Sequence, residues 1–242
     1  MIILAIDTSG KSISVALSES GKILDEVLEK TRLQHASRLL PAINGLLEKN
    51  NLTLGDIDLF ATTTGPGSFT GIRIALSAIM GMAYGTGKKV YGTSSLAALA
   101  AGVFVPDTVI VPVLDARGGR VFSGIYLNGA SLITETPREI SDFLQLLSDK
   151  YSQKEKIIVV GDGSSLIKDF LALHKTDDVS VSSDLDFIFA CSDKNKISAA
   201  EVAGLAYAAY EKGDKFLWPF ELKATYGIES AAKRNLANKD EH

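Results

Sequence analysis

Two short acidic motifs carry the residue types that could hold a phosphorylated ligand. Asp7-Thr8-Ser9-Gly10 follows an apolar strand pattern at residues 2–6, and Asp115-Ala116-Arg117-Gly118 follows a similar pattern at residues 109–114. Small hydroxyl groups and free backbone N–H groups in a turn can bind phosphate oxygens, and a carboxylate can bind Mg²⁺ or water. The same residue types also form ordinary turns. Because Asp115 stands in a position corresponding to Asp7, we favour two carboxylates that face each other across a cleft, although the second motif lacks the hydroxyl groups. The candidate nucleotide contacts are Asp7, Thr8, Ser9 and Asp115.

The most unusual stretch, residues 65–73, reads Gly65-Pro66-Gly67-Ser68-Phe69-Thr70-Gly71-Ile72-Arg73 and separates a strand pattern from a helix pattern. Glycine permits positive φ or close backbone approach, and proline fixes φ between the two glycines. Ser68 or Thr70 could cap the helix, whose first N–H groups could meet an anion. The stretch is neither a P-loop, because no lysine follows, nor a dinucleotide fingerprint, because no acidic residue lies about 20 residues on. We therefore predict a rigid strand-to-helix elbow, with an anion site as the less favoured alternative.

Other catalytic and metal-binding patterns are missing from the sequence. Its three histidines, His35, His174 and His242, form no HxxxH or HExxH pair. Its one cysteine, Cys191, lies in a polar stretch, and no serine lies in a G-x-S-x-G turn. We therefore predict no catalytic residue and no metal site in this chain.

The composition indicates a soluble globular protein that does not grip nucleic acid unaided. The chain has 25 basic against 29 acidic residues and a sequence pI of about 5.5, whereas phosphate neutralisation needs a basic surface. A single cysteine cannot form an internal disulfide, which is typical of a reducing cytoplasm. The first residues lack a basic leader, and the longest apolar helix pattern is too short to span a bilayer. We expect a cytoplasmic chain without a membrane anchor.

The pattern of strands, turns and helices occurs twice along the chain. The two acidic motifs have the same spacing between acid and glycine, and a second glycine, Gly21 or Gly129, follows each at the same distance. A further echo pairs residues 64–68 with residues 160–164, each between a strand pattern and a helix pattern. Two echoes in one order predict a duplication, and hence an α/β protein with two lobes of mixed sheets, flanking helices and a cleft between the lobes. The predicted units are a first lobe at 1–105, a smaller second lobe at 106–217 and a docked segment with a polar tail at 218–242, with the last helix (198–212) able to pack back on the first lobe.

An apolar helix pattern follows the elbow. Between Ile72 and Tyr84 almost no polar face is left, and a helix that is apolar all round must be covered on all sides. A core helix of the first lobe is one interpretation. We slightly favour a helix half-covered by another subunit, because a lobe of about 100 residues cannot easily surround it. Gly81 and Gly85 would allow the close approach.

Several of these motifs resemble the bacterial TsaB (YeaZ) family. The resemblance lies in the start MIILAIDTS, in His35 with Leu39-Leu40-Pro41, in GPGSFTGIR at residues 65–73, and in VLDAR at residues 113–117 with Val121. It covers residues 1–130 with specific motifs and the remainder only as general architecture. The chain departs from the family at its end, where Pro219-Phe220-Glu221-Leu222-Lys223 stands in place of Pro-x-Tyr-Leu-Arg.

The resemblance implies the actin-like ATPase (ASKHA) superfold and a role in forming N6-threonylcarbamoyladenosine at position 37 of tRNAs that read ANN codons. It implies a non-catalytic subunit that binds and activates a catalytic paralogue, TsaD, works with an ATPase, TsaE, and meets tRNA only within that complex. No cofactor is then required by this chain, with ATP or ADP bound weakly or at the subunit junction. The isolated chain is expected to form a homodimer.

The resemblance also implies that the partner surface lies on the first-lobe helices, near 36–50 and 70–86. The expected partner-facing residues are Leu39, Ile43, Leu47, Ile72, Leu76, Ile79, Met80 and Tyr84. The family-motif residues of the elbow are Gly65, Pro66, Gly67, Ser68, Phe69, Thr70, Gly71 and Arg73.

Two other functions stay open. A phosphotransferase or carbamoyltransferase of the same superfold could act alone through Asp7 and Asp115, and it would bind Mg²⁺–nucleotide tightly. A glycoprotease-type peptidase is less favoured, because the sequence offers no convincing nucleophile–base pair or set of metal ligands.

Overall fold

Two β-sheets with the same strand order form the two halves of the computed structural model, which describes residues 1–30, 35–151, 155–173 and 185–225. The first sheet has the order β3-β2-β1-β4-β5. Its strands are β1 (Ile2–Asp7), β2 (Ser12–Glu19), β3 (Lys22–Lys30), β4 (Leu59–Thr63) and β5 (Lys89–Thr93).

The second sheet has the order β10-β7-β6-β11-β12, with the short strands β8 and β9 attached to β6. Its strands are β6 (Val109–Arg117), β7 (Arg120–Ser123), β8 (Tyr126–Leu127), β9 (Ala130–Ser131), β10 (Thr136–Glu139), β11 (Lys156–Val160) and β12 (Asp186–Phe189). β1 pairs antiparallel with β2 and parallel with β4, and β6 pairs in the same way with β7 and β11. This repeated topology confirms the predicted actin-like ATPase (ASKHA) superfold with two duplicated α/β lobes.

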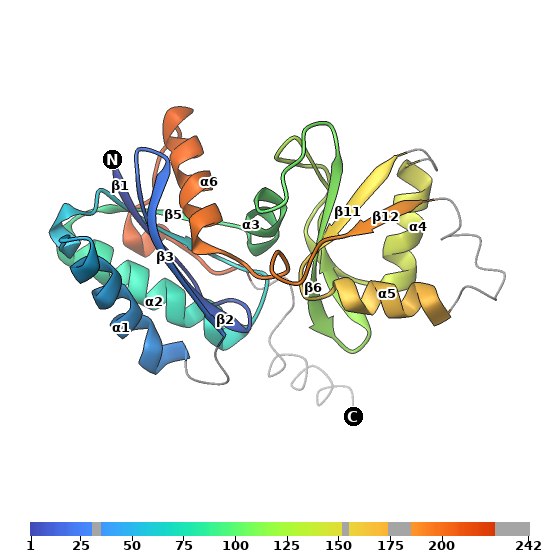
Figure 1. Cartoon of the computed structure of the whole chain (residues 1–242), viewed down its shortest axis with the longest axis horizontal. Helices are drawn as coiled ribbons and strands as arrows, with labels where there is room; N and C mark the ends of the chain where they lie inside the picture. Colours follow the sequence, from blue (N-terminus) through green and yellow to red (C-terminus); the bar gives the residue numbers. More distant parts are fainter. Residues whose placement is uncertain (31–34, 152–154, 174–184, 226–242) are drawn as a thin grey trace, which may run out of the picture.

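Six α-helices of the described chain flank the sheets, and α3 lies between the two lobes (Figure 1). In the first lobe, α1 and α2 contact one side of the sheet, and α6 contacts β1, β2 and β4 from the other side. The helices are α1 (His35–Lys49), α2 (Phe69–Thr86), α3 (Ser95–Ala101), α4 (Ile140–Lys150), α5 (Ser164–Leu173) and α6 (Ala199–Glu211), with short 3-10 turns η1 (Leu54–Asp56) and η2 (Pro219–Glu221).

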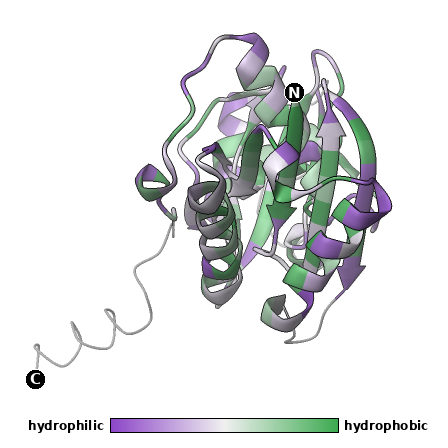
Figure 2. Ribbon diagram, turned by 90° about the vertical axis from the view of Figure 1, so that its left-hand side faces the viewer, coloured by the Kyte–Doolittle hydropathy of each residue, from purple (hydrophilic) through white to green (hydrophobic). Residues whose placement is uncertain are grey.

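The strand β1 is buried on both faces because two different cores use it. Side chains alternate along a strand, so Leu4 and Ile6 pack with α1 and α2, whereas Ile3 and Ala5 pack with α3 and α6. In Figure 2 the strand that begins at the N-terminus is accordingly coloured hydrophobic along most of its length. This burial explains why the first strand is a nearly continuous apolar run in the sequence.

The core on the α3 and α6 side is shared by the two lobes. The same cluster that contains Ile3 and Ala5 also contains Leu114, Phe122 and Tyr126 from the second lobe. The second lobe has a further core of its own, which packs its sheet against α4 and α5. The lobes are therefore joined by apolar packing as well as by the chain.

The segment at 217–225 covers the outer edge of the first sheet. Leu217 exchanges two backbone hydrogen bonds with Val90 of β5, at 3.0 and 3.1 Å. The ammonium group of Lys89 lies 3.5 Å from the ring centroid of Trp218, a cation–π contact. The backbone N–H of Thr225 then donates to the carbonyl of Thr64 at 2.7 Å. An edge strand with open N–H and C=O groups invites unwanted pairing, and this segment satisfies part of that edge.

Within the described residues, no helix combines the length and the apolar character that crossing a membrane would need.

Candidate functional site

The first acidic motif forms the β1–β2 hairpin, and its carboxylate points into the protein. Asp7 is 1% exposed. Its Oδ1 accepts hydrogen bonds from the Ser9 hydroxyl at 2.6 Å, from the Ser9 backbone N–H at 3.3 Å and from the Thr63 hydroxyl. Thr63 reaches Asp7 because β4 lies parallel and next to β1. Asp7 therefore ties the hairpin to the end of β4.

The elbow packs directly against this hairpin. The Thr8 hydroxyl donates to the Gly71 carbonyl at 2.6 Å, and the Ser68 N–H donates to the Ser9 carbonyl at 2.7 Å. The Ser68 side chain accepts from the Gly71 N–H at 3.2 Å, so Ser68 is the N-cap of α2. Of the two cap residues that the sequence left open, the structure selects Ser68.

The elbow glycines are required by close backbone contacts. A Cβ on Gly71 would lie 1.9 Å from the Thr8 carbonyl oxygen. Gly65 has a φ of 113°, which favours glycine, and a Cβ there would lie 2.2 Å from the carbonyl oxygen of Thr225. The elbow is therefore a tightly packed junction of the hairpin, α2 and the C-terminal segment.

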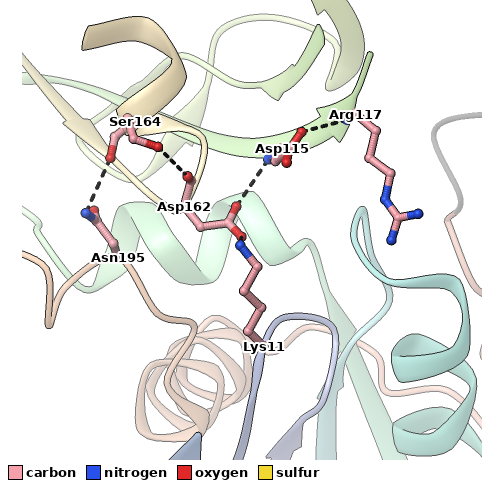
Figure 3. A network of polar contacts seen from close by, with 7 residues as sticks. Lys11, Asp115, Arg117, Asp162, Ser164 and Asn195 are labelled. Atoms are coloured by element: carbon pink, nitrogen blue, oxygen red, sulfur yellow. Dashed lines mark hydrogen bonds and ion pairs between the residues drawn. The ribbon is translucent and has the colours of Figure 1, made fainter. Parts of the chain in front are cut away.

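The second acidic motif forms the β6–β7 hairpin, and there the aspartate is exposed. Figure 3 shows Asp115 between Arg117 and Asp162. Asp115 Oδ1 accepts from the Arg117 N–H at 2.7 Å, a local turn bond, while the Asp115 N–H donates to Asp162 Oδ1 at 3.1 Å. The other oxygen of Asp162 pairs with Lys11 of the first hairpin at 3.2 Å. The two predicted carboxylates thus have different environments. A Lys11–Asp162 ion pair joins the first hairpin to the β11–α5 turn, which itself accepts a hydrogen bond from the second hairpin.

Asn195 completes this network. Its side-chain carbonyl accepts from the Gly161 N–H at 2.8 Å, and its amide donates to the Ser164 hydroxyl at 3.3 Å. Lys11, Asp162 and Asn195 were not among the predicted site residues. The sequence could have indicated Asp162, because it is the acidic residue of the second echo at 160–164. Lys11 and Asn195 belong to no motif, so nothing in the sequence pointed to them.

A second polar cluster joins the lobes beside α3. Glu135, just before β10, accepts hydrogen bonds from the hydroxyl of Tyr126 and from the hydroxyl of Ser94. Ser94 is the N-cap of α3, and the next residue, Ser95, donates its N–H to the Gly65 carbonyl at 2.9 Å. The side chain of Tyr126 is only 4% exposed. This burial is the main reason why the pKa of its hydroxyl is raised, and the negative charge of Glu135 is the second.

The raised pKa of Tyr126 predicts a loss of stability at alkaline pH. Above pH 10 the unfolded chain releases this proton while the folded chain keeps it, so the free energy of unfolding falls as pH rises. Between pH 8.5 and 10.5, the wild type should lose about 0.8 kcal/mol more than Tyr126→Phe, measured by urea denaturation. Equal losses in the two proteins would contradict the assignment.

In the described part of the chain, no three His, Cys, Asp or Glu side chains gather in a way that could hold a metal ion.

Comparison with known proteins decides the family. A family model described as TsaD, tRNA N6-adenosine threonylcarbamoyltransferase, matches residues 23–236. The tRNA threonylcarbamoyladenosine biosynthesis protein TsaB of Bacillus subtilis is 30% identical over 175 residues, which cover 71% of this chain and 75% of that protein. The chain belongs to the TsaB (YeaZ) family. TsaB of Escherichia coli is 31% identical over 67% of this chain and 72% of its own length. The solved structure of YeaZ from Pseudomonas aeruginosa covers 93% of this chain and 99% of its own, with a TM-score of 0.71 and 24% identity, and agrees in fold.

The resemblance to the TsaB family led us to expect a partner surface on α1 and α2. The structure shows that most of the side chains expected on this surface lie in the core instead. Six of the eight expected partner-facing residues are buried in the core of the same lobe, because the apolar stripes of both helices face the sheet. They are Leu39, Ile43, Leu47, Ile72, Leu76 and Ile79. Met80 is half-buried against the same core, and Tyr84 is 80% exposed. Of these eight residues, only Tyr84 and part of Met80 are exposed where another protein could contact them.

The two helices still present apolar groups on their outer side. Leu40 of α1 is 53% exposed, and Phe69 at the start of α2 is 40% exposed. The guanidinium of Arg73 lies 3.9 Å from the ring centroid of Phe69. These residues, with Tyr84, define the outer helix face, the name used below for Leu40, Phe69, Arg73 and Tyr84. Whether a partner binds there stays a prediction.

Proposed function

We propose that this chain is a non-catalytic accessory subunit that binds and activates the catalytic paralogue TsaD in the formation of N6-threonylcarbamoyladenosine at position 37 of ANN-decoding tRNAs. The observation that carries the proposal is the similarity to TsaB proteins along most of their length, which are named for the biosynthesis of this nucleoside. The match to a TsaD family model supports a shared ancestry with the proposed catalytic partner.

The engagement of Asp7 supports a non-catalytic role. A carboxylate that holds a metal-bound nucleotide must offer its oxygens to the ligand. Asp7 instead directs an oxygen to Ser9 and Thr63 and has almost no exposed surface. The chain then needs no cofactor of its own, and ATP or ADP binds weakly or at the junction with the partner.

The outer helix face supports the partner proposal. Exposed aromatic and arginine side chains dominate the binding energy of protein interfaces, and Tyr84, Phe69 and Arg73 supply these types on one helix. The same face would mediate a homodimer of the isolated chain, with TsaE and tRNA joining only in the complete cytoplasmic complex.

A second candidate function, a transferase that acts alone, is favoured by the threonylcarbamoyltransferase activity for which the matching family model is named. An omit-one reconstitution separates the two. tRNA, threonylcarbamoyl-adenylate, ATP, TsaD and TsaE are combined with or without this chain, and modified adenosine is quantified. The accessory role requires that product depends on this chain and that the chain alone makes none. Product from the chain alone would establish the transferase, and product unaffected by omission would refute both.

A surface variant tests the partner face without touching the core. Tyr84→Asp should weaken binding to TsaD at least about tenfold, because an exposed aromatic anchor is replaced by a charge. Tyr210→Asp is the matched control, since Tyr210 is also exposed, at 49%, but lies on α6. Titration of the labelled chain with TsaD measures both affinities. Equal affinities for the two variants would place the interface elsewhere.

A further inference from the structure

Glu135 connects the two lobes through a side chain whose two oxygens have separate partners. It lies in the second lobe, between β9 and β10. One oxygen accepts from the hydroxyl of Tyr126 in the same lobe, and the other accepts from the hydroxyl of Ser94, which follows β5 of the first lobe. Ser94 and Glu135 are 41 residues apart in the sequence.

The hydrogen-bond geometry favours a carboxylate at this position. A serine hydroxyl has one proton and two acceptor sites, and Ser94 Oγ already accepts from the N–H groups of Leu96 at 3.0 Å and Ala97 at 3.4 Å. Its proton is therefore the group that it directs to the Glu135 carboxylate. Tyr126 also donates, so both oxygens of Glu135 must accept, which an amide side chain cannot do.

The neighbouring residue carries the connection into the elbow. Ser95 is fully buried. Its N–H donates to the Gly65 carbonyl at 2.9 Å, and its hydroxyl donates to the Ser9 hydroxyl at 3.2 Å. At the start of α3, Ser94 thus contacts the second lobe, and the next residue, Ser95, contacts the elbow and the first hairpin.

The core beneath α3 makes this connection stiff. Leu96 and Leu99 of α3 belong to the same apolar cluster as Ala61 of the first lobe and Phe122 and Tyr126 of the second. Packed interiors transmit displacements because they contain little free volume. A shift of the start of α3 therefore moves groups in both lobes.

We propose that Glu135 is an interlobe latch: by accepting from Ser94 it fixes the start of α3, and through Ser95 it positions the elbow from which α2 begins. The second lobe thereby controls the placement of the first turn of α2. The latch stands independently of the proposed function, because every contact that forms it lies within this chain.

Hydrogen exchange measured by mass spectrometry on the full chain tests the latch. Glu135→Ala removes both acceptor oxygens, so the Ser94 hydroxyl loses its partner in the second lobe. Loss of a hydrogen bond to a charged group should speed exchange about tenfold in peptides that cover residues 94–101 and the elbow at 65–73. Glu139→Ala is the matched control, since Glu139 lies four residues further along the chain and makes no side-chain cap bond to α4. In the Glu139 variant, the peptides that cover residues 94–101 and 65–73 should exchange as in the wild type.

Tyr126→Phe separates a latch from general loosening of the second lobe. This variant removes the other bond of Glu135 and leaves the bond to Ser94, so faster exchange should be confined to residues near 126–136. If Glu135→Ala does not fold by circular dichroism, Glu135→Leu tests the same contact, because leucine fills more of the space and likewise offers no acceptor. Wild-type exchange at the elbow in the Glu135 variant, or equal exchange there in the Glu135 and Tyr126 variants, would overturn the proposal.

Discussion

Replacing Gly71 by alanine should destabilise the chain by about 2–3 kcal/mol, although alanine is the better helix former. Gly71 lies in the first turn of α2, where an added Cβ would fall 1.9 Å from the Thr8 carbonyl oxygen. Both groups are backbone-anchored, so the clash can be relieved only by moving the hairpin away from the elbow. That movement would break the Thr8–Gly71 hydrogen bond of 2.6 Å and the Ser68–Ser9 bond of 2.7 Å.

Gly81→Ala is the matched control on the same helix. No described atom outside its own turn lies within 4 Å of a Cβ built there. Alanine should therefore raise the free energy of unfolding by up to about 1 kcal/mol, through its helix propensity alone. Urea denaturation of the two variants and the wild type gives both differences. A Gly71→Ala protein as stable as Gly81→Ala would show that the elbow is not packed as described.

Asp7→Ala should cost about 2–4 kcal/mol of stability in the absence of any nucleotide. The substitution removes the acceptor that serves the hydroxyls of Ser9 and Thr63 inside the protein. Buried donors that lose their acceptor bear the full cost of leaving water. Asp7→Asn should cost less, because its carbonyl oxygen can still accept at the position of Oδ1.

Asp115→Ala is the control for the second hairpin. Asp115 is exposed and makes a local turn bond to Arg117, so its removal should change stability by no more than about 1 kcal/mol. Thermal unfolding with and without Mg²⁺–ATP completes the experiment. If Asp7→Ala is as stable as the wild type but loses a nucleotide-induced shift in Tm, Asp7 is a ligand-binding residue and the non-catalytic proposal is weakened.

The duplicated architecture was predictable because the same glycine spacings occur twice in the sequence. The acidic residue and the glycines of each hairpin have the same separation in both lobes, so the sequence alone matches the two hairpins and the two strand-to-helix turns. β5 and β12 were not predicted, because strands of five and four residues are too short to show a distinct alternation of apolar and polar residues. Their placement depends on neighbours that are distant in the sequence.

The orientation of side chains was less predictable than the elements that carry them. The nearly all-apolar α2 was clear in the sequence, but an apolar helix surface fits a core and a partner equally well. The structure shows that Ile72 and Ile79 face the sheet. Likewise, an aspartate after a strand has the same sequence signature whether it turns inward, as Asp7 does, or outward, as Asp115 does. Burial decided each case, and burial depends on residues remote in the chain.

The core shared by the two lobes makes the two duplicated units dependent on each other for folding. Two copies of one unit have become mutually dependent, because Ile3 and Ala5 of one lobe share a cluster with Phe122 and Tyr126 of the other. If the chain were cut near residue 105, each fragment would expose to solvent the apolar surface that now packs against the other lobe. The internal symmetry that is visible in the sequence therefore does not correspond to two units that fold separately, because each lobe needs the other to bury part of its apolar surface.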